Sequence, residues 1–200
     1  MDIEAAQRGK TMHDYTGIAN FLFEMGNLKR IKRTGWWIAG VKDPETIAEH
    51  SHRVALLGSI IASMEGADPA RTCYLGTVHD IPETRIGDIP HVGRAYLSAK
   101  PAEDITADQV SGCPDEPALA IKGAVEEFEA NETLEARCAK DADKLECLVQ
   151  AIEYKHTGLQ TTEPWVQNSL KALKTESAKR IAEAVVDGDP LAWQHTRAND

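Results

Sequence analysis

The densest group of potentially reactive side chains is the segment HDIPETRIGD, residues 79–88. An imidazole, His79, directly precedes a carboxylate, Asp80, and a second carboxylate, Glu83, follows about one helical turn later. Neutral imidazole and carboxylate together suit divalent cations of intermediate hardness, such as Mn, Fe, Co, Zn or Ni. If a helix ends here, its dipole disfavours the two negative charges, so a positive group should compensate them. The segment therefore indicates a cation site.

A second candidate ligand is His50. On a helix that advances about 100° per residue, His50 falls on the same face as Val54 and Ile61, whereas His52 points away from it. An imidazole directed at a core must be hydrogen-bonded or bound to a metal to offset its desolvation. The pattern alone leaves both interpretations open.

A third acidic group is KDADK, residues 140–144, which opens an apolar helical stripe. The same helical periodicity puts Asp141 on the apolar face and Asp143 on the opposite side. Taken alone, such a pair is most simply explained as part of a solvated helix surface. The periodicity favours Asp141 as the inward-facing carboxylate.

A run of cationic residues precedes two tryptophans in LKRIKRTGWW, residues 28–37. The cations could complement a helix C-terminus. Alternatively, the planar guanidinium of Arg33 could bind phosphate oxygens. Trp36 and Trp37 could wall a nucleoside pocket, or one of them could belong to the core.

Together these segments resemble the His-Asp (HD) metal-dependent phosphohydrolase superfamily. AEHSHR around His50, VHDIPE around His79 and KDADKLE around Asp143 occur in the order of its motifs. RTGWW from Arg33 and GDIP around Asp88 are similar to further motifs of its 5′-deoxynucleotidase branch. The resemblance covers roughly residues 15–155.

The resemblance implies a role for each matching residue. His50, His79, Asp80 and Asp143 match the four metal ligands, which makes Asp141 the alternative to Asp143. The other matches are Glu83 for water activation or proton transfer, Asp88 as a substrate-contacting and candidate catalytic carboxylate, and Arg33 and Trp36 as phosphate and sugar contacts.

One residue departs from the pattern of the family. Pro82 stands where the resemblance leads us to expect a small residue. Proline disfavours α conformation at the preceding Ile81, so the position of Glu83 relative to the HD pair is open.

The periodicity predicts an all-α protein, a compact HD-domain bundle with the metal site between helices. We expect one domain over residues 1–200, with its core at about 15–155 and C-terminal helices within 160–195 packed on it. Asp43 with Pro44, and Asp68 with Pro69, are typical N-cap and first-turn pairs. The predicted helices cover residues 15–28, 44–65, 69–80, 116–130, 133–154, 165–173 and 176–186, with a long loop over 81–113.

Composition excludes some classes of function. The chain has 22 Lys and Arg against 32 Asp and Glu, a formal net charge of −10, and lacks the extended basic surface that binds nucleic acid. The longest uncharged apolar stretch, residues 54–64, is about half of the ~20 residues that cross a membrane. No secretory signal is visible and the four cysteines form no CxxC pair, so we expect a cytoplasmic protein without membrane contact.

The main hypothesis is a divalent-metal-dependent phosphomonoesterase acting on nucleoside 5′-monophosphates, with deoxynucleotides favoured by the resemblance. The cation could be Mn, Co, Mg, Fe, Ni or Zn, and the resemblance also implies a homodimer. One alternative is an HD-type phosphodiesterase or pyrophosphohydrolase, for example an alarmone hydrolase. The other is a non-catalytic, metal-binding helical interaction protein.

Overall fold

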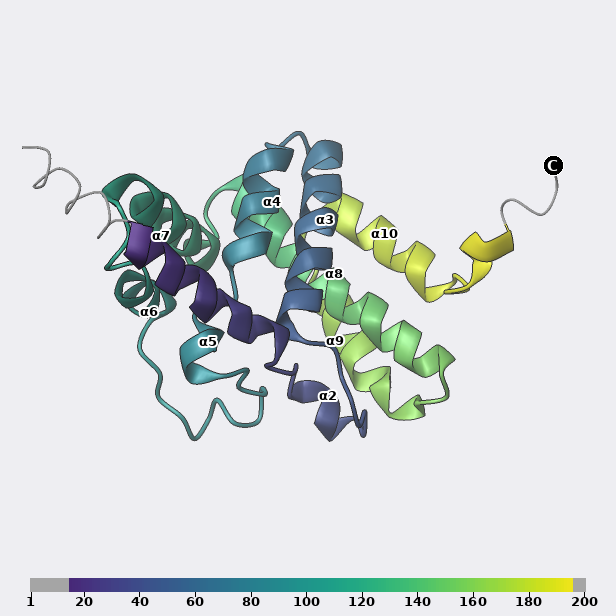
Figure 1. Ribbon diagram of the computed structural model, residues 1–200. Coiled ribbons are helices and arrows are strands. Elements are labelled where there is room, and N and C mark those ends of the chain that lie inside the picture. Colours follow the sequence, from purple (N-terminus) through teal and green to yellow (C-terminus); the bar gives the residue numbers. More distant parts are fainter. Residues whose placement is uncertain (1–14, 196–200) are drawn as a thin grey trace, which may run out of the picture.

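The computed structural model describes residues 15–195, and its regular elements are helices, apart from one isolated bridge between Lys32 and Thr46 (Figure 1). The predicted all-α class is confirmed. A first helix covers residues 15–25. It is followed by the 3₁₀ turn η1 (Gly26–Lys29), α2 (Gly35–Ile38), α3 (Ile47–Glu65), α4 (Pro69–Val78), α5 (Glu83–Ile86), α6 (Ala102–Gln109), α7 (Asp115–Ala130), α8 (Leu134–His156), η2 (Gln160–Thr162), α9 (Glu163–Ala172), α10 (Glu176–Val186) and η3 (Ala192–His195).

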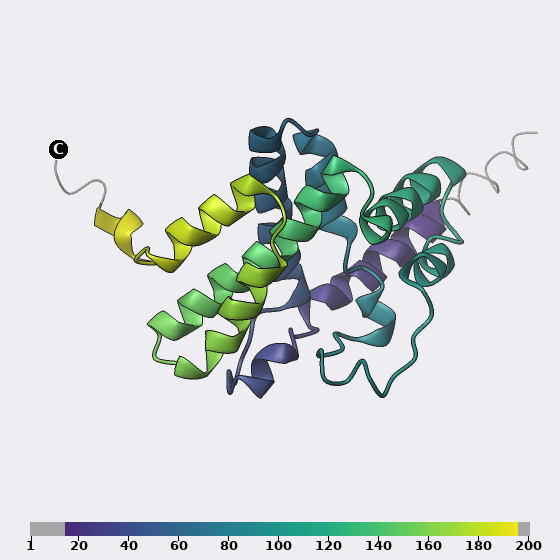
Figure 2. The same ribbon diagram turned by 180° about the vertical axis from the view of Figure 1, so that it is seen from behind.

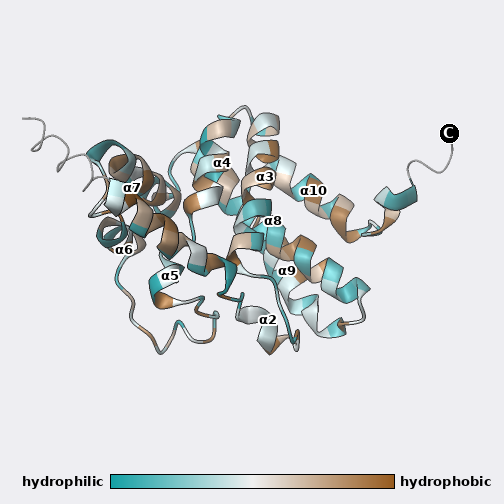
Figure 3. Ribbon diagram, viewed as in Figure 1, coloured by the Kyte–Doolittle hydropathy of each residue, from teal (hydrophilic) through white to brown (hydrophobic). Residues whose placement is uncertain are grey.

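The long helices α3 and α8 lie side by side at the centre, with α4 against both of them (Figures 1 and 2). The apolar faces of these helices contribute to two hydrophobic cores. One core joins α2, α3, α8, α9 and α10, and includes the fully buried Ile61 and Leu148. The other joins the start of α3 with α4, α7 and the first helix, and includes Leu75 and Phe128. Apolar and polar residues accordingly alternate around the helices (Figure 3).

The predicted start of α3 at Pro44, with Asp43 as N-cap, is wrong. The N-cap is Thr46, whose hydroxyl accepts a hydrogen bond from Glu49 N while the Glu49 carboxylate accepts one from Thr46 N. This capping box satisfies two orphan backbone donors of the first turn. The preceding residues are held in an extended path, because Arg33 N donates to Glu45 O.

The region predicted as one long loop, residues 81–113, contains two helices, α5 and α6. The helix before it also ends earlier than predicted: α4 stops at Val78, and the chain turns through residues 79–82 before α5 begins at Glu83. α6 is short and has Ile105 as its only large apolar residue, which explains why periodicity missed it. Tertiary contacts hold it in place: the Gln109 side chain at its end donates to Ile81 O.

The C-terminal helices α9 and α10 pack against α8. Their bounds agree with the periodicity to within two residues, and α10 coincides with the predicted range. None of the helices in the described range 15–195 combines the length and apolar character needed to cross a bilayer.

The closest approach of α3 and α4 depends on a glycine. A Cβ placed on Gly76 would lie 3.0 Å from Cα and 3.1 Å from N of Ala55, so any side chain there would push the helices apart. This contact brings the end of α4 against the first half of α3. The His50 and His79 rings, one from each helix region, are consequently 5.4 Å apart between centroids.

Gly76→Ala should therefore lower the free energy of unfolding by about 1–3 kcal/mol, because the added methyl group overpacks the α3–α4 contact. Urea unfolding of the metal-free protein measures the change. Gly123→Ala is the matched control: Gly123 lies within α7, where a Cβ meets nothing within 4 Å, and it should stabilise the protein by about 0.5–1 kcal/mol. Equal effects of the two substitutions would contradict the close-packing argument.

Candidate metal and active site

Three separate parts of the chain bring the predicted ligands together. His50 projects from α3, His79 and Asp80 lie at and just after the end of α4, and Asp143 projects from α8. His50 Nε2 lies 3.3 Å from Asp143 Oδ1 and 3.7 Å from Asp80 Oδ2, and His79 Nε2 lies 3.1 Å from Asp80 Oδ2. The four side chains thus converge on one point.

Hydrogen bonds on the far side of each ring orient both histidines. His50 Nδ1 is 2.5 Å from Glu146 Oε2, and His79 Nδ1 is 2.8 Å from Gly76 O. Each partner is an acceptor, so each Nδ1 carries a hydrogen and each ring turns its Nε2 toward the carboxylates, where a neutral ring offers a lone pair to a cation. Both Nε2 atoms are buried and have no hydrogen-bond partner within the described residues.

Lone pairs and carboxylates that face one another repel unless a positive charge lies between them. The donor set, two imidazole nitrogens and two carboxylates, suits a divalent transition cation and also admits harder ions. The ligand atoms of His50, His79 and Asp80 lie within 4.8 Å of one another, which a single ion can span. The residues present therefore fit a divalent metal.

The pKa shifts within the cluster also indicate that it requires positive charge. Burial and the Arg33 charge lower the pKa of His50, but the carboxylates of Glu146 and Asp143 outweigh them and raise this pKa to about 10. Burial raises the pKa of Asp80, yet His79, Arg33 and His50 together hold it well below its usual range. In the metal-free chain a proton supplies part of the positive charge that the cluster requires.

The structure distinguishes between the two carboxylates of KDADK. Asp143 faces His50, whereas Asp141 accepts hydrogen bonds from the backbone N–H groups of Lys174 and Thr175 and thereby anchors the start of α10. The periodicity that favoured Asp141 identified a buried face correctly. That face meets α10, while a different face of α8 meets α3 and carries Asp143.

Glu83 remains at the cluster despite Pro82. The turn over residues 79–82 makes Glu83 the first residue of α5, with Glu83 N donating to Asp80 O at 3.1 Å. Burial, followed by the charges of Asp80 and Asp88, raises the pKa of Glu83 to about 9. A carboxyl group in this position holds a proton near neutral pH unless a bound cation offsets those charges.

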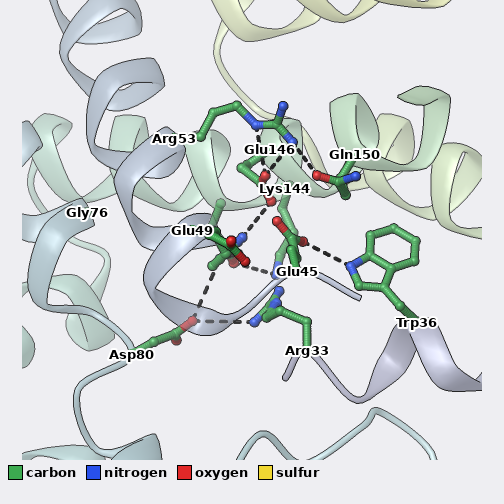
Figure 4. Close-up of polar contacts among 12 residues, drawn as sticks. Arg33, Trp36, Glu45, Glu49, Arg53, Gly76, Asp80, Lys144, Glu146 and Gln150 are labelled. Atoms are coloured by element: carbon green, nitrogen blue, oxygen red, sulfur yellow. Dashed lines mark hydrogen bonds and ion pairs between the residues drawn. The ribbon is translucent and has the colours of Figure 1, made fainter. Parts of the chain in front are cut away.

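Arg33 and Asp88 form the wall next to the candidate ligands. Arg33 Nη1 lies 3.4 Å from Asp80 Oδ2 (Figure 4). The same nitrogen lies 3.6 Å from Asp88 Oδ1. The other carboxylate oxygen of Asp88 accepts hydrogen bonds from both the backbone N–H and the hydroxyl of Thr34. The loop after α5 therefore lies beside α2 (Figures 1 and 2).

Trp36 belongs to the core, whereas Trp37 is exposed. The Trp36 ring stacks on Trp165 with centroids 5.6 Å apart, and its Nε1 donates to Glu45 Oε1 at 2.9 Å (Figure 4). Trp36 still borders a cavity of about 140 Å³ beside the candidate ligands. This cavity is lined by Arg33, Gly35, Trp36, residues 88–91, Arg94, Cys147 and Trp165.

A larger open groove of about 720 Å³ lies elsewhere, lined in part by Lys29, Lys32 and His52. None of the four candidate ligands borders it. The convergence of donor atoms, rather than cavity size, therefore marks the candidate site.

Comparison with known proteins identifies the family. The family model described as "HD domain" matches residues 25–185. The chain belongs to the HD domain family. A zebrafish (Danio rerio) protein named 5′-deoxynucleotidase HDDC2 is 32% identical over 190 residues, covering 86% of this chain and 94% of the relative. The human protein of the same name is 30% identical over 145 residues, covering 72% and 71%.

Solved structures share this fold. A conserved hypothetical protein from Pyrococcus furiosus superposes with a TM-score of 0.70 at 30% identity, covering 84% of this chain and 97% of that one. The predicted membership of the HD family, near its 5′-deoxynucleotidase branch, is confirmed.

The sequence reasoning missed the partners that hold this HD-domain cluster together. Glu146 is fully buried between His50 and Arg53, whose Nη2 lies 2.8 Å from Glu146 Oε1. Arg53 also donates to Gln150 at 2.7 Å (Figure 4) and to Glu153 at 2.8 Å. These three polar residues recur at helical spacing on α8, so a polar stripe facing α3 was visible in the sequence.

Glu146→Gln should weaken metal binding by about 10–100-fold, because an amide in place of the carboxylate no longer fixes the His50 tautomer or raises its basicity. Calorimetric titration of the apo protein with Mn²⁺ or Co²⁺ measures the dissociation constant. The midpoint of thermal unfolding should also rise less on addition of metal than in the wild type.

Glu153→Gln is the matched control, since Glu153 bonds the same arginine but lies at the more exposed end of the stripe. It should leave the metal dissociation constant within about twofold. The positioning role of Glu146 is wrong if its glutamine variant binds metal as tightly as this control.

Proposed function

We propose that this HD-domain protein is a divalent-metal-dependent 5′-deoxynucleotidase, which hydrolyses the phosphate ester of deoxynucleoside 5′-monophosphates. The observation that carries the proposal is the convergence of His50, His79, Asp80 and Asp143 beside a second group made of Arg33, Glu83 and Asp88. Relatives about 30% identical over most of their length carry this name, which supports the same reaction here.

A bound divalent cation would supply Lewis acidity toward a phosphate oxygen and lower the pKa of a coordinated water. His50, His79, Asp80 and Asp143 are the residues that would hold it. Which cation acts in the cell is a matter of availability as well as of ligand type, so Mn, Co, Mg, Fe, Ni and Zn all remain candidates.

The residues around the metal position have distinct tasks. Arg33, fixed by Asp80 and Asp88, offers its remaining N–H groups to phosphate oxygens as negative charge shifts toward the leaving oxygen. Glu83 has one buried carboxylate oxygen without a hydrogen-bond partner among the described residues. It can therefore orient the attacking water and hold or release a proton at that oxygen. Asp88 positions Arg33 and Thr34, and Trp36 forms the wall of the adjoining cavity.

We also infer that the protein is a cytoplasmic homodimer. Leu56, Ile60 and Met64 are exposed at four-residue spacing along α3, and an apolar stripe of this kind supports a protein contact. The net charge of −10 supports a small anionic substrate, bound through local cationic groups, in place of nucleic acid.

The reaction is tested by loading the apo protein with single metals and measuring phosphate release from the common deoxynucleoside and ribonucleoside 5′-monophosphates. Deoxynucleotides should be hydrolysed fastest, and chelation should abolish the activity. Glu83→Gln should reduce kcat at least 100-fold with metal content unchanged, because a general acid–base contribution is about 10²–10⁴-fold.

Glu116→Gln, at an exposed position in the first turn of α7, is the control for this change and should keep full activity. Hydrolysis of guanosine polyphosphates without release of phosphate from monophosphates would favour the pyrophosphohydrolase alternative. Bound metal with no turnover of either class would favour the non-catalytic one.

A further inference from the structure

Arg94 differs from the other arginines of the described chain. Arg33, Arg53, Arg71 and Arg85 form ion pairs, Arg30 bonds Asn27, and Arg137 bonds a backbone carbonyl. Arg180 forms neither a hydrogen bond nor an ion pair with the described residues, but its charge contributes to the lowered pKa of Glu65. Within residues 15–195 the guanidinium of Arg94 has no hydrogen bond, ion pair or ring contact. Lys42 and Lys171 likewise have no carboxylate partner among the described residues, so what distinguishes Arg94 is its position.

The position of Arg94 gives this observation a functional meaning. It lies on the loop after α5 and lines the 140 Å³ cavity that Arg33, Asp88 and Trp36 also line. Hydrogen bonds from Thr34 to Asp88 hold the start of this loop against the segment that carries Arg33. The cavity is smaller than the roughly 300–1,000 Å³ typical of sites that enclose a whole ligand, so it fits one part of a substrate.

The charges around the cavity indicate that a bound phosphate needs a second positively charged side chain besides Arg33. Asp80, Asp88 and Asp143 lie close to the place where a phosphate dianion would bind, and Glu83 lies beside them. Arg33, the nearest arginine, already faces two of these carboxylates through one of its nitrogens. Its positive charge is therefore largely offset by protein carboxylates before any substrate arrives.

We propose that Arg94 is a second anion-binding arginine of the site, and that its guanidinium binds phosphate oxygens of the nucleotide. His91 lines the same cavity and provides a further donor on the same loop. Because Arg94 is exposed and has no protein partner among the described residues, a charge-assisted hydrogen bond to the ligand replaces only bonds to water. This inference rests on the proposed function for the identity of the nucleotide, but not for the binding of phosphate itself.

Inorganic phosphate is the probe that tests the proposal most directly. Calorimetric titration of the metal-loaded protein should give a phosphate dissociation constant about tenfold higher for Arg94→Gln than for the wild type. Arg94→Lys should lie between the two, since it keeps the charge but loses the planar fork. With thymidine 5′-monophosphate as substrate, Arg94→Gln should raise KM by a similar factor and change kcat less.

Lys100→Gln is the matched control. Lys100 is an exposed cation on the same loop, 3.8 Å from Asp108, and does not line the cavity. Its substitution makes the same change in net charge and should leave both the phosphate dissociation constant and KM unchanged. An equal loss in the two variants would show a general effect of charge and would overturn the proposal.

Thymidine, which lacks the phosphate, separates an anion contact from a base contact. Arg94→Gln should leave inhibition by thymidine unchanged, and an equal weakening of thymidine and phosphate would overturn the proposal. If the wild type releases no phosphate from any nucleotide but Arg94→Gln still weakens phosphate binding, the proposed reaction fails while the anion site stands. If the wild type hydrolyses nucleotides but Arg94→Gln binds phosphate as tightly as the wild type, the proposed reaction stands and the anion site at Arg94 is overturned.

Discussion

The structure depends on one constraint: a fully buried imidazole, His50, must have both of its ring nitrogens satisfied. Glu146 takes the Nδ1 hydrogen, and the opposite nitrogen faces Asp80 and Asp143. An unpaired carboxylate as deeply buried as Glu146 would cost several kcal/mol, and Arg53 offsets this cost with a hydrogen bond from Nε and an ion pair through Nη2. The contact between α3 and α8 is therefore polar at the site and apolar on either side of it.

This arrangement reconciles an acidic protein with an anionic substrate. The net charge of −10 describes the whole molecule. The electrostatic field at the substrate is set mainly by the nearest charges, which are those at the metal position, Arg33 and Arg94. Several of the carboxylates are not surface groups at all. Asp80, Asp143 and Glu146 face cations or protonated rings, so their negative charge is largely neutralised where it lies.

Much of the fold and of the candidate site could be predicted from the sequence, and the failures have physical causes. Helical periodicity identified α10 to the residue and placed His50 on an inward face, because both signals depend only on the local repeat. It failed for Asp141 because α8 has more than one buried face. It failed for the start of α3 because Thr46 and Glu49 form a capping box, so the helix begins after Thr46 and not at Pro44. Glu146 was missed because its role depends on His50, a residue far away in the sequence. Arg94 was missed because its role depends on the cavity that it lines, and no local pattern predicts either relationship.

The wide separation of the candidate ligands along the chain has a consequence for biosynthesis. While the chain is being made, α3 and α4 are complete long before α8 exists, so His50 and His79 can meet when neither Glu146 nor Asp143 is yet available. Until α8 has been made, the pair α3 and α4 carries a histidine that cannot be buried at low cost, and one of the four candidate cation ligands, Asp143, is missing. Metal binding should therefore coincide with the docking of α8, and the ion would stabilise the long-range contact between α8 and the pair α3 and α4.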